Sequence, residues 1–290
     1  KQRMINQFKF SGHETFHCRH FWLKKGVDHL SAGSSFKNKE AVVELGVGKN
    51  MVTSISHWLK AFGLANVDLE LTELANLLLK DGGYDEYLES EGSLWLLHYQ
   101  LQKVGYSSIY NMAFNQFRKS RVSFDFTLPA LSDYLIRQCK VNNIQFSTNT
   151  ISSDVKIFSR SYCPPIRGSK NLEDDLSALF IDLRLIYEVD GLKDNGDQVY
   201  RFNYGLHQTL PALIFLFAIM DQFDGESSIT FEDIQRKVGD VFLCNQEQTH
   251  LLIDDLVENE YVVYNEDAGR KEIQMKTDLN KWEILKNFYE

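Results

Sequence analysis

The side chains best able to do chemistry gather in one short stretch near the start of the chain. The seventeen residues of Phe10–Gly26, FSGHETFHCRHFWLKKG, include three histidines, a glutamate, a cysteine and three basic residues. They are His13, Glu14, His17, Cys18, Arg19, His20, Lys24 and Lys25. Imidazole and carboxylate groups transfer protons or bind metals, and arginine and lysine stabilise phosphate charge. This stretch is therefore the first candidate for a catalytic site.

The segment HETFH matches His-Glu-x-x-His, the spacing of zinc peptidases, in which the glutamate is the base. That chemistry requires a helix, because only helical i, i+4 spacing places both imidazoles on one side. Ser11-Gly12 directly precedes His13, which favours a turn or a helix N-terminus instead. A zinc peptidase is the remote alternative. A different metal site using the histidines, or an ordered arm whose aromatic residues are core, also stays open.

Composition limits the class of protein. The 290 residues are 43% hydrophobic and 13% aromatic, which predicts a folded chain of two or three domains. Four scattered cysteines without a CxxC pair argue against a zinc ribbon or a disulfide framework and favour a reducing cytoplasm. The longest apolar run, Leu210–Met220, is too short to span a bilayer, so we expect no membrane partner.

Charge is distributed unevenly along the chain. The net charge is −9, yet residues 1–60 and 105–170 each carry +6, whereas 61–104 carry −6 and 171–290 carry −15. Local basic surface provides affinity for phosphate even in an acidic protein. The two basic segments are thus candidates for DNA contact.

The first basic segment contains a predicted helix-turn-helix. Lys39–Leu45 is a short helix, Gly46-Val47-Gly48 a tight turn, and Lys49–Phe62 a second helix ended by Gly63. Apolar residues recur on one stripe of the second helix and leave a polar face outside. That outer face is expected to carry Lys49, Asn50, Thr53, Ser54, His57 and Lys60. Helix-turn-helix proteins present such a face to the major groove, although a helical hairpin that only packs remains the alternative.

The pattern occurs twice more. Leu131–Val141 and Thr150–Tyr162 form a second helix pair, with Lys156 and Arg160 outside. Residues 231–275 predict two helices followed by a two-stranded wing, but the second helix is acidic and suits a protein-interaction role. We predict a mainly α protein with small β-hairpin wings, built from tandem winged-helix or helix-turn-helix units. The expected domains are 1–104, 105–170 and 171–290, the last boundary lying in Gly168–Asp175.

Several blocks resemble a bacterial family catalogued as domain of unknown function number four thousand and seven. These blocks are FSGHETF, WLKKG, ELGVGKNMV, HWLKAFGL and LWLLHYQL, with weaker agreement in TISSDVKIFSRSY, VYRFNYG and LPALIF. Family members are associated with DNA phosphorothioation genes, and one is regarded as a DNA-nicking component of a modification and defence system. The resemblance implies a role in sulfur modification of the DNA backbone beside a cysteine desulfurase and ATP-using subunits. His13, Glu14 and Arg19 belong to the shared block and His17 does not, which weakens the peptidase match.

We therefore expect a cytoplasmic protein that binds double-stranded DNA and nicks one strand to allow sulfur incorporation. The alternative is a non-catalytic DNA-binding or recruitment subunit of the same system. Candidate catalytic residues are His13 as base or metal ligand, Glu14 as metal ligand or orienting group, and Arg19 as phosphate clamp. A divalent metal cofactor is left open. Candidate DNA contacts are Lys24, Lys25, Lys49, Asn50, Thr53, His57, Lys60, Lys156 and Arg160. The aromatic residues of Phe10–Gly26 are expected to anchor this stretch on the Lys39–Phe62 unit.

Overall fold

The structure is a computed structural model that describes residues 8–164, 177–267, 269–276, 278 and 280–290. The chain is mainly α-helical with small antiparallel sheets, as the sequence predicts. It divides into two compact units, Lys1–Glu89 with Gln100–Asn203, and Ser90–Tyr99 with Tyr204–Glu290. The expected boundary within Gly168–Asp175 lies outside the described residues, and the three-domain division stays a prediction.

The first unit begins with a helical half. Its helices are α1 (Trp22–Ser31), α2 (Ala41–Leu45), α3 (Lys49–Ala61) and α4 (Glu73–Leu78), followed by the second part of α5 (Glu91–Val104). Gly46 ends α2 in a left-handed conformation with φ 64°, and Gly48 is the N-cap of α3. This confirms the predicted helix, glycine turn and helix. After α3, Ala65 and Leu71 form a single antiparallel β-bridge.

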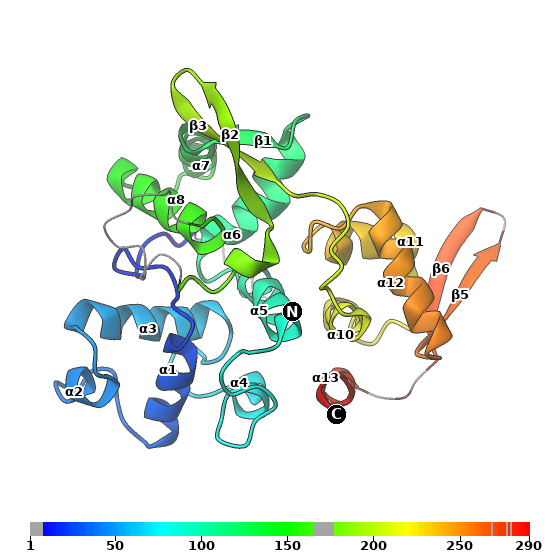
Figure 1. The fold of residues 1–290 in the computed structure, drawn as a ribbon, viewed down its shortest axis with the longest axis horizontal. Coiled ribbons are helices and arrows are strands. Elements are labelled where there is room, and N and C mark those ends of the chain that lie inside the picture. The colour runs from blue at the N-terminus through cyan, green and yellow to red at the C-terminus, as the bar shows by residue number, and fades with distance from the viewer. Residues whose placement is uncertain (1–7, 165–176, 268, 277, 279) are drawn as a thin grey trace. The chain divides into compact units, whose positions relative to one another are not determined.

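The rest of this unit packs helices against a three-stranded sheet (Figure 1). The elements are α6 (Ser108–Asn111), a π-helical turn (Met112–Phe117), a 3₁₀ turn (Arg118–Ser120), β1 (Asp125–Thr127), α7 (Leu128–Val141), α8 (Thr148–Tyr162), a 3₁₀ turn (Ile181–Leu183), β2 (Ile186–Asp194) and β3 (Asp197–Phe202). The strand order is β1-β3-β2. Asn195 and Gly196, both at positive φ, form the two-residue turn between β2 and β3.

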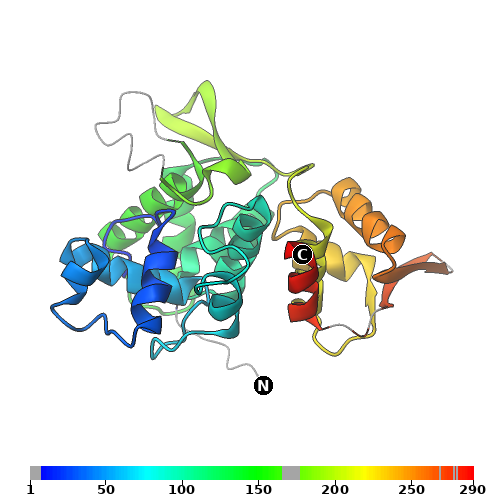
Figure 2. The ribbon, with the colours of Figure 1, turned by 60° about the horizontal axis from the view of Figure 1, so that its bottom comes forward.

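The second unit takes the first part of α5 and adds α10 (Ala212–Gln222), β4 (Ser228–Thr230), α11 (Phe231–Ile234), a π-helical turn (Gln235–Gly239), α12 (Gln246–Glu258), β5 (Val262–Asp267), β6 (Arg270–Met275) and α13 (Lys281–Tyr289). The sheet order is β4-β6-β5, and β5 and β6 form a long hairpin (Figures 1 and 2). Thr209, just before α10, accepts a hydrogen bond from Trp95 Nε1 at 3.1 Å, and Pro211 is the N-cap.

Aromatic side chains make up much of the core of both units. The largest fully buried side chains include Trp58, Tyr110 and Phe158 in the first unit and Trp95 and Phe215 in the second. All four cysteines are free and buried. Within the described ranges, none of the helices combines the length and the apolar content needed to span a bilayer.

Candidate functional site

The N-terminal arm, residues 8–20, passes between α8 and α3 (Figure 1). Ser11, Gly12, Glu14 and Thr15 all have positive φ, and the Phe16 N–H donates to the His13 carbonyl at 2.8 Å, so the HETFH segment contains a turn and is not a helix. A side chain at Gly12 would meet His57, because a Cβ built there lies 2.7 Å from His57 Nδ1. Glycine thus permits the arm to lie directly on α3. The expected docking of this stretch on the Lys39–Phe62 unit is confirmed, but the expectation that all of its aromatic residues anchor it is wrong for Phe21, which is 60% exposed.

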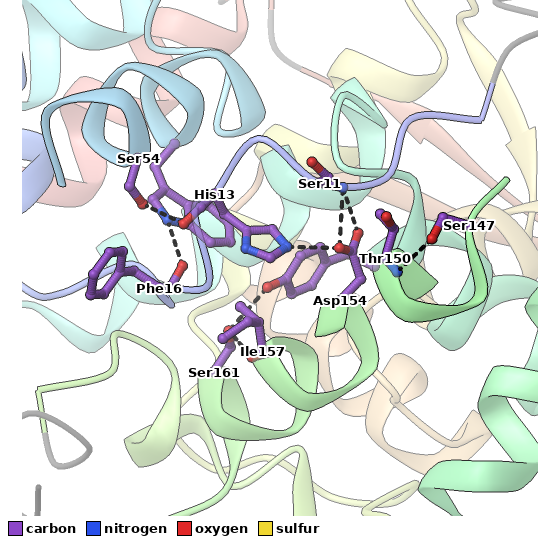
Figure 3. Close-up of polar contacts among 11 residues, drawn as sticks. Ser11, His13, Phe16, Ser54, Ser147, Thr150, Asp154, Ile157 and Ser161 are labelled. Carbon is purple, nitrogen blue, oxygen red and sulfur yellow. Dashed lines mark hydrogen bonds and ion pairs between the residues drawn. The ribbon is translucent and has the colours of Figure 1, made fainter. Parts of the chain in front are cut away.

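His13 is the centre of the contacts that hold the arm (Figure 3). Its Nε2 lies 2.9 Å from Asp154 Oδ1 on α8, and its carbonyl accepts a hydrogen bond from Ser54 Oγ on α3 at 3.0 Å. The imidazole stacks on Trp58, with ring centroids 6.2 Å apart and 20° between the planes. Because a carboxylate only accepts, Nε2 of His13 carries a hydrogen and donates it to Asp154. His13 therefore links two helices that lie about a hundred residues apart in sequence.

Asp154 was not among the residues expected from the sequence. It is 1% exposed, and both of its carboxylate oxygens also accept from the backbone N–H of Ser11, at 3.0 and 3.1 Å. The sequence contained a signal for it. Asp154 falls between Ile151, Val155 and Phe158 on the buried stripe of α8, and a carboxylate on an apolar stripe needs a buried partner.

The arrangement differs from that of a zinc peptidase. His13 and His17 both precede α1 and lie outside any helix, so they do not share a helix face, and this alternative is wrong. In the part of the chain that the structure describes, no group of three His, Cys, Asp or Glu side chains is placed to hold a metal ion. Of the histidines of the arm, His13 packs between α3 and α8, whereas His20 Nε2 lies 2.7 Å from the carbonyl oxygen of Tyr87.

His57 and Ser54 lie under the arm rather than on the outer face of α3. Ser54 is fully buried and His57 is 5% exposed, so the prediction that they point outward is wrong. Burial, reinforced by the nearby His13, Lys9 and Lys60, lowers the pKa of His57 to about 3. A neutral, covered imidazole has no direct route to a phosphate.

Lys24 is likewise engaged inside the unit. It is 6% exposed, and its Nζ lies 2.6 Å from Asp28, 2.5 Å from Asp81 and 3.4 Å from Glu86. Burial opposes its charge, but the hydrogen bonds to Asp28 and Asp81 outweigh that effect and raise the pKa of Lys24. The charge is thus neutralised within the fold.

The other candidate DNA-contacting side chains are more exposed to solvent. Lys49, Asn50 and Thr53 are exposed on the first turns of α3, and Lys60 is half-buried near its end. Lys156 and Arg160 are exposed on α8. Lys25 is exposed and donates to the carbonyl of Leu45 at 3.2 Å.

The two remaining catalytic candidates lie on the arm itself. Glu14 is exposed on the turn after His13. Arg19 is half-buried, forms a backbone bridge with Ala178, and holds its guanidinium 5.1 Å from the ring centroid of Trp22. The structure thus joins the arm to α3 and α8, where most of the exposed candidate contacts lie.

Comparison with known proteins assigns the chain to a family. The model of the family described as "Protein of unknown function (DUF4007)" matches residues 10–289, so the chain belongs to this family. Among solved structures it is similar to two crystal structures of SspB, one of them with magnesium ion bound. Each is 27% identical to this chain with a TM-score of 0.83, and each match covers 97% of this chain and 88% of SspB. A search of curated proteins found no match.

Proposed function

We propose that this protein binds duplex DNA through its first unit and acts in a bacterial DNA phosphorothioate modification and defence system. The observation that carries the proposal is the likeness to SspB, which extends over nearly the whole chain and is not limited to one motif. The partners implied are a cysteine desulfurase and ATP-using subunits. The proposed reaction is hydrolysis of one DNA strand, which opens the backbone for sulfur incorporation.

The exposed residues of α3 and α8 support the DNA-binding part of the proposal. A glycine turn precedes α3, and Lys49, Asn50 and Thr53 occupy its exposed N-terminal turns. Helix-turn-helix proteins contact base edges with this part of the second helix. Lys156 and Arg160 extend the set of exposed phosphate-binding side chains to α8. Lys24 and His57 are not carried into this surface, because one is ion-paired and the other covered.

We further propose that the second unit contains a winged helix. Its order α10-β4-α11-α12-β5-β6 and its sheet β4-β6-β5 match a three-helix unit with a β-hairpin wing. The helix in the recognition position, α12, exposes Glu247, Asp254, Asp255 and Glu258. Carboxylates repel phosphate, so α12 serves contacts with protein partners and not with DNA.

DNA binding is tested by removing two cations of α3. Replacing Lys49 and Lys60 together by Ala should weaken binding and lower the slope of log affinity against log salt by about 1.8, since each phosphate contact contributes about 0.9. Fluorescence anisotropy with a plain duplex between low and moderate salt measures both. Lys271→Ala with Lys276→Ala, in the acidic second unit, is the matched control. An unchanged affinity and slope would sink the proposed surface.

One observation favours a second candidate, a DNA-binding or recruitment subunit without its own nuclease activity. The ring of His13 is buried and bonded to Asp154, so the nominated base is not open to solvent. Relaxation of a supercoiled plasmid, with magnesium or with a chelator, decides between the two. Glu14→Gln and Arg19→Gln are the informative variants, since both residues are at least partly exposed. If the protein binds the plasmid but leaves it supercoiled, the second candidate is supported.

A further inference from the structure

A groove of about 500 Å³ lies between the arm and the segment that leads into α8. Its walls come from residues 8–11 on one side and from residues 145–151 on the other. This volume is within the range of about 300–1,000 Å³ typical of small-molecule sites. Both walls belong to the first unit, and none of the residues proposed above for catalysis lines the groove.

The groove is lined by aromatic rings that are only partly covered. Phe8, Phe10 and Phe146 are all half-buried. The rings of Phe8 and Phe10 meet edge to face, with centroids 6.3 Å apart and 72° between the planes. Within the described ranges, Phe146 forms no contact with another aromatic ring, and its side chain is only partly buried. Aromatic faces of this kind stack nucleobases with little dependence on sequence.

Polar and basic groups stand beside these rings. Gln145 is exposed at the mouth, and its amide can both donate to and accept from the edge of a base. Ser147 and Thr150 also line the groove, and the Thr150 N–H donates to Ser147 Oγ at 3.5 Å, the N-terminal cap of α8. Lys9 Nζ lies 3.4 Å from the ring centroid of Tyr106 and brings a positive charge to the same segment.

The arm wall of the groove is fixed in place. The Ser11 N–H donates to Asp154 (Figure 3). The backbone N–H of Lys9 donates to Ser108 Oγ at 2.8 Å, and the backbone N–H of Ser108 donates to the carbonyl of Lys9 at 3.0 Å. A groove whose walls are already ordered loses little conformational entropy when it is filled.

We infer that this groove accepts a single nucleobase unstacked from DNA. The inference rests on the proposed function, that the first unit binds DNA, and adds the part of the substrate that the groove recognises. An extruded base is flat and apolar on its faces and polar at its edge, which matches phenylalanine walls with an amide at the mouth. The flanking phosphates carry the charge that Lys9 complements. Extruding a base also exposes the phosphodiester groups on either side of it, and one of these is the bond to be hydrolysed.

The probe is a duplex with one unpaired nucleotide, prepared with each of the four bases and with an abasic residue at that position. Wild-type protein should bind the base-bearing bulges about tenfold more tightly than the abasic bulge, in line with base–aromatic stacking. Phe146→Leu should abolish this preference, because leucine keeps the apolar volume but has no ring. Phe146→Tyr should retain it. Gln145→Ala should reduce it, whereas Gln116→Ala, an exposed glutamine outside the groove, should not.

Equal affinity for base-bearing and abasic bulges, or an unchanged preference in Phe146→Leu, would overturn the groove as a base site. That result is distinct from failure of the proposed function. In the latter case the wild-type protein would bind none of the duplexes, paired or bulged. A preference that persists in Phe146→Leu but disappears with Lys49→Ala would place the base elsewhere and would also reject the groove.

Discussion

Asp154 accepts hydrogen bonds from two groups of the arm while almost fully buried, so its removal should release the arm. Asp154→Asn keeps the shape but places an amide NH₂ among donors that need an acceptor. We expect a loss of about 1–3 kcal/mol in the free energy of unfolding, the usual cost of an unsatisfied buried group. Urea denaturation measures it, and proteolysis of the arm should accelerate in parallel. Asp133→Asn, exposed on α7, is the matched control, and equal losses for the two variants would contradict the assigned role.

The sequence predicted which segments pack together better than the contacts of each residue within them. It selected the arm and α3, and the structure joins these two segments. It missed Asp154 because no local sequence pattern indicates that Ser11 and Asp154, 143 residues apart, are in contact. For the same reason it placed Ser54 and His57 outside, since the helical period shows a polar face but cannot show that the arm covers it. Long-range contacts of this kind are not encoded in any short window.

His57 should make the first unit sensitive to acid. Its folded-state pKa of about 3 lies below its ordinary value of 6.5, so the unfolded chain takes up a proton at a pH where the folded chain does not. The free energy of unfolding should therefore fall as the pH drops from about 6.5 towards 3, by roughly 1 kcal/mol per pH unit for this one group. His57→Gln should flatten this dependence in urea titrations at stepped pH.

The half-buried His250 on α12 provides the comparison, as His250→Gln. A slope that is the same in the wild type and in both variants would show that His57 does not set the acid response. His98 in the second unit, also with a pKa lowered to about 3 by burial, should give a second and separate contribution of the same sign.

At the scale of elements, local chemistry predicted the ends of helices well. Gly46 ends α2 as predicted, and the hydroxyls of Thr72 and Ser147 cap α4 and α8. Thr209 precedes α10 but does not cap it, because its hydroxyl accepts from Trp95, more than a hundred residues earlier. A capping residue is thus predictable only where no distant donor competes for its oxygen.

The packing of α1 on α3 depends on a close approach at Gly26. A Cβ there would lie 2.8 Å from Leu59 Cδ1 and 2.9 Å from Ile55 Cγ2, both in fully buried side chains. Alanine would favour the helix by about 1 kcal/mol, but overpacking costs about 1–3 kcal/mol. We expect Gly26→Ala to be net destabilising in thermal or urea unfolding. Gly205→Ala, where a Cβ meets no atom within 4 Å, should have little effect. A more stable Gly26→Ala variant would show that the two helices can separate without loss.

At the scale of the whole molecule, the two units differ strongly in charge. The first holds 24 basic and 22 acidic residues, for a net +2, and the second holds seven and 18, for a net −11. The sequence alone showed the alternation of charge but not the units, because residues 90–99 group with residues far later in the chain. The acidic unit is a poor neighbour for phosphate, so the charge of the units agrees with DNA contact through the first.

The arm has a consequence for how the chain is made. Ser11 leaves the ribosome long before Asp154, its partner 143 residues later, and Ser93 waits 196 residues for the hydroxyl of Tyr289. At synthesis rates of about 5–20 residues per second, the arm remains without its partner for roughly 7 to 30 s. During that time the apolar residues around Phe10 and Phe16 are open to chaperones and to aggregation. A nascent chain interrupted before α8 can place the arm against α3, but it lacks the Asp154 carboxylate that holds Ser11 and His13.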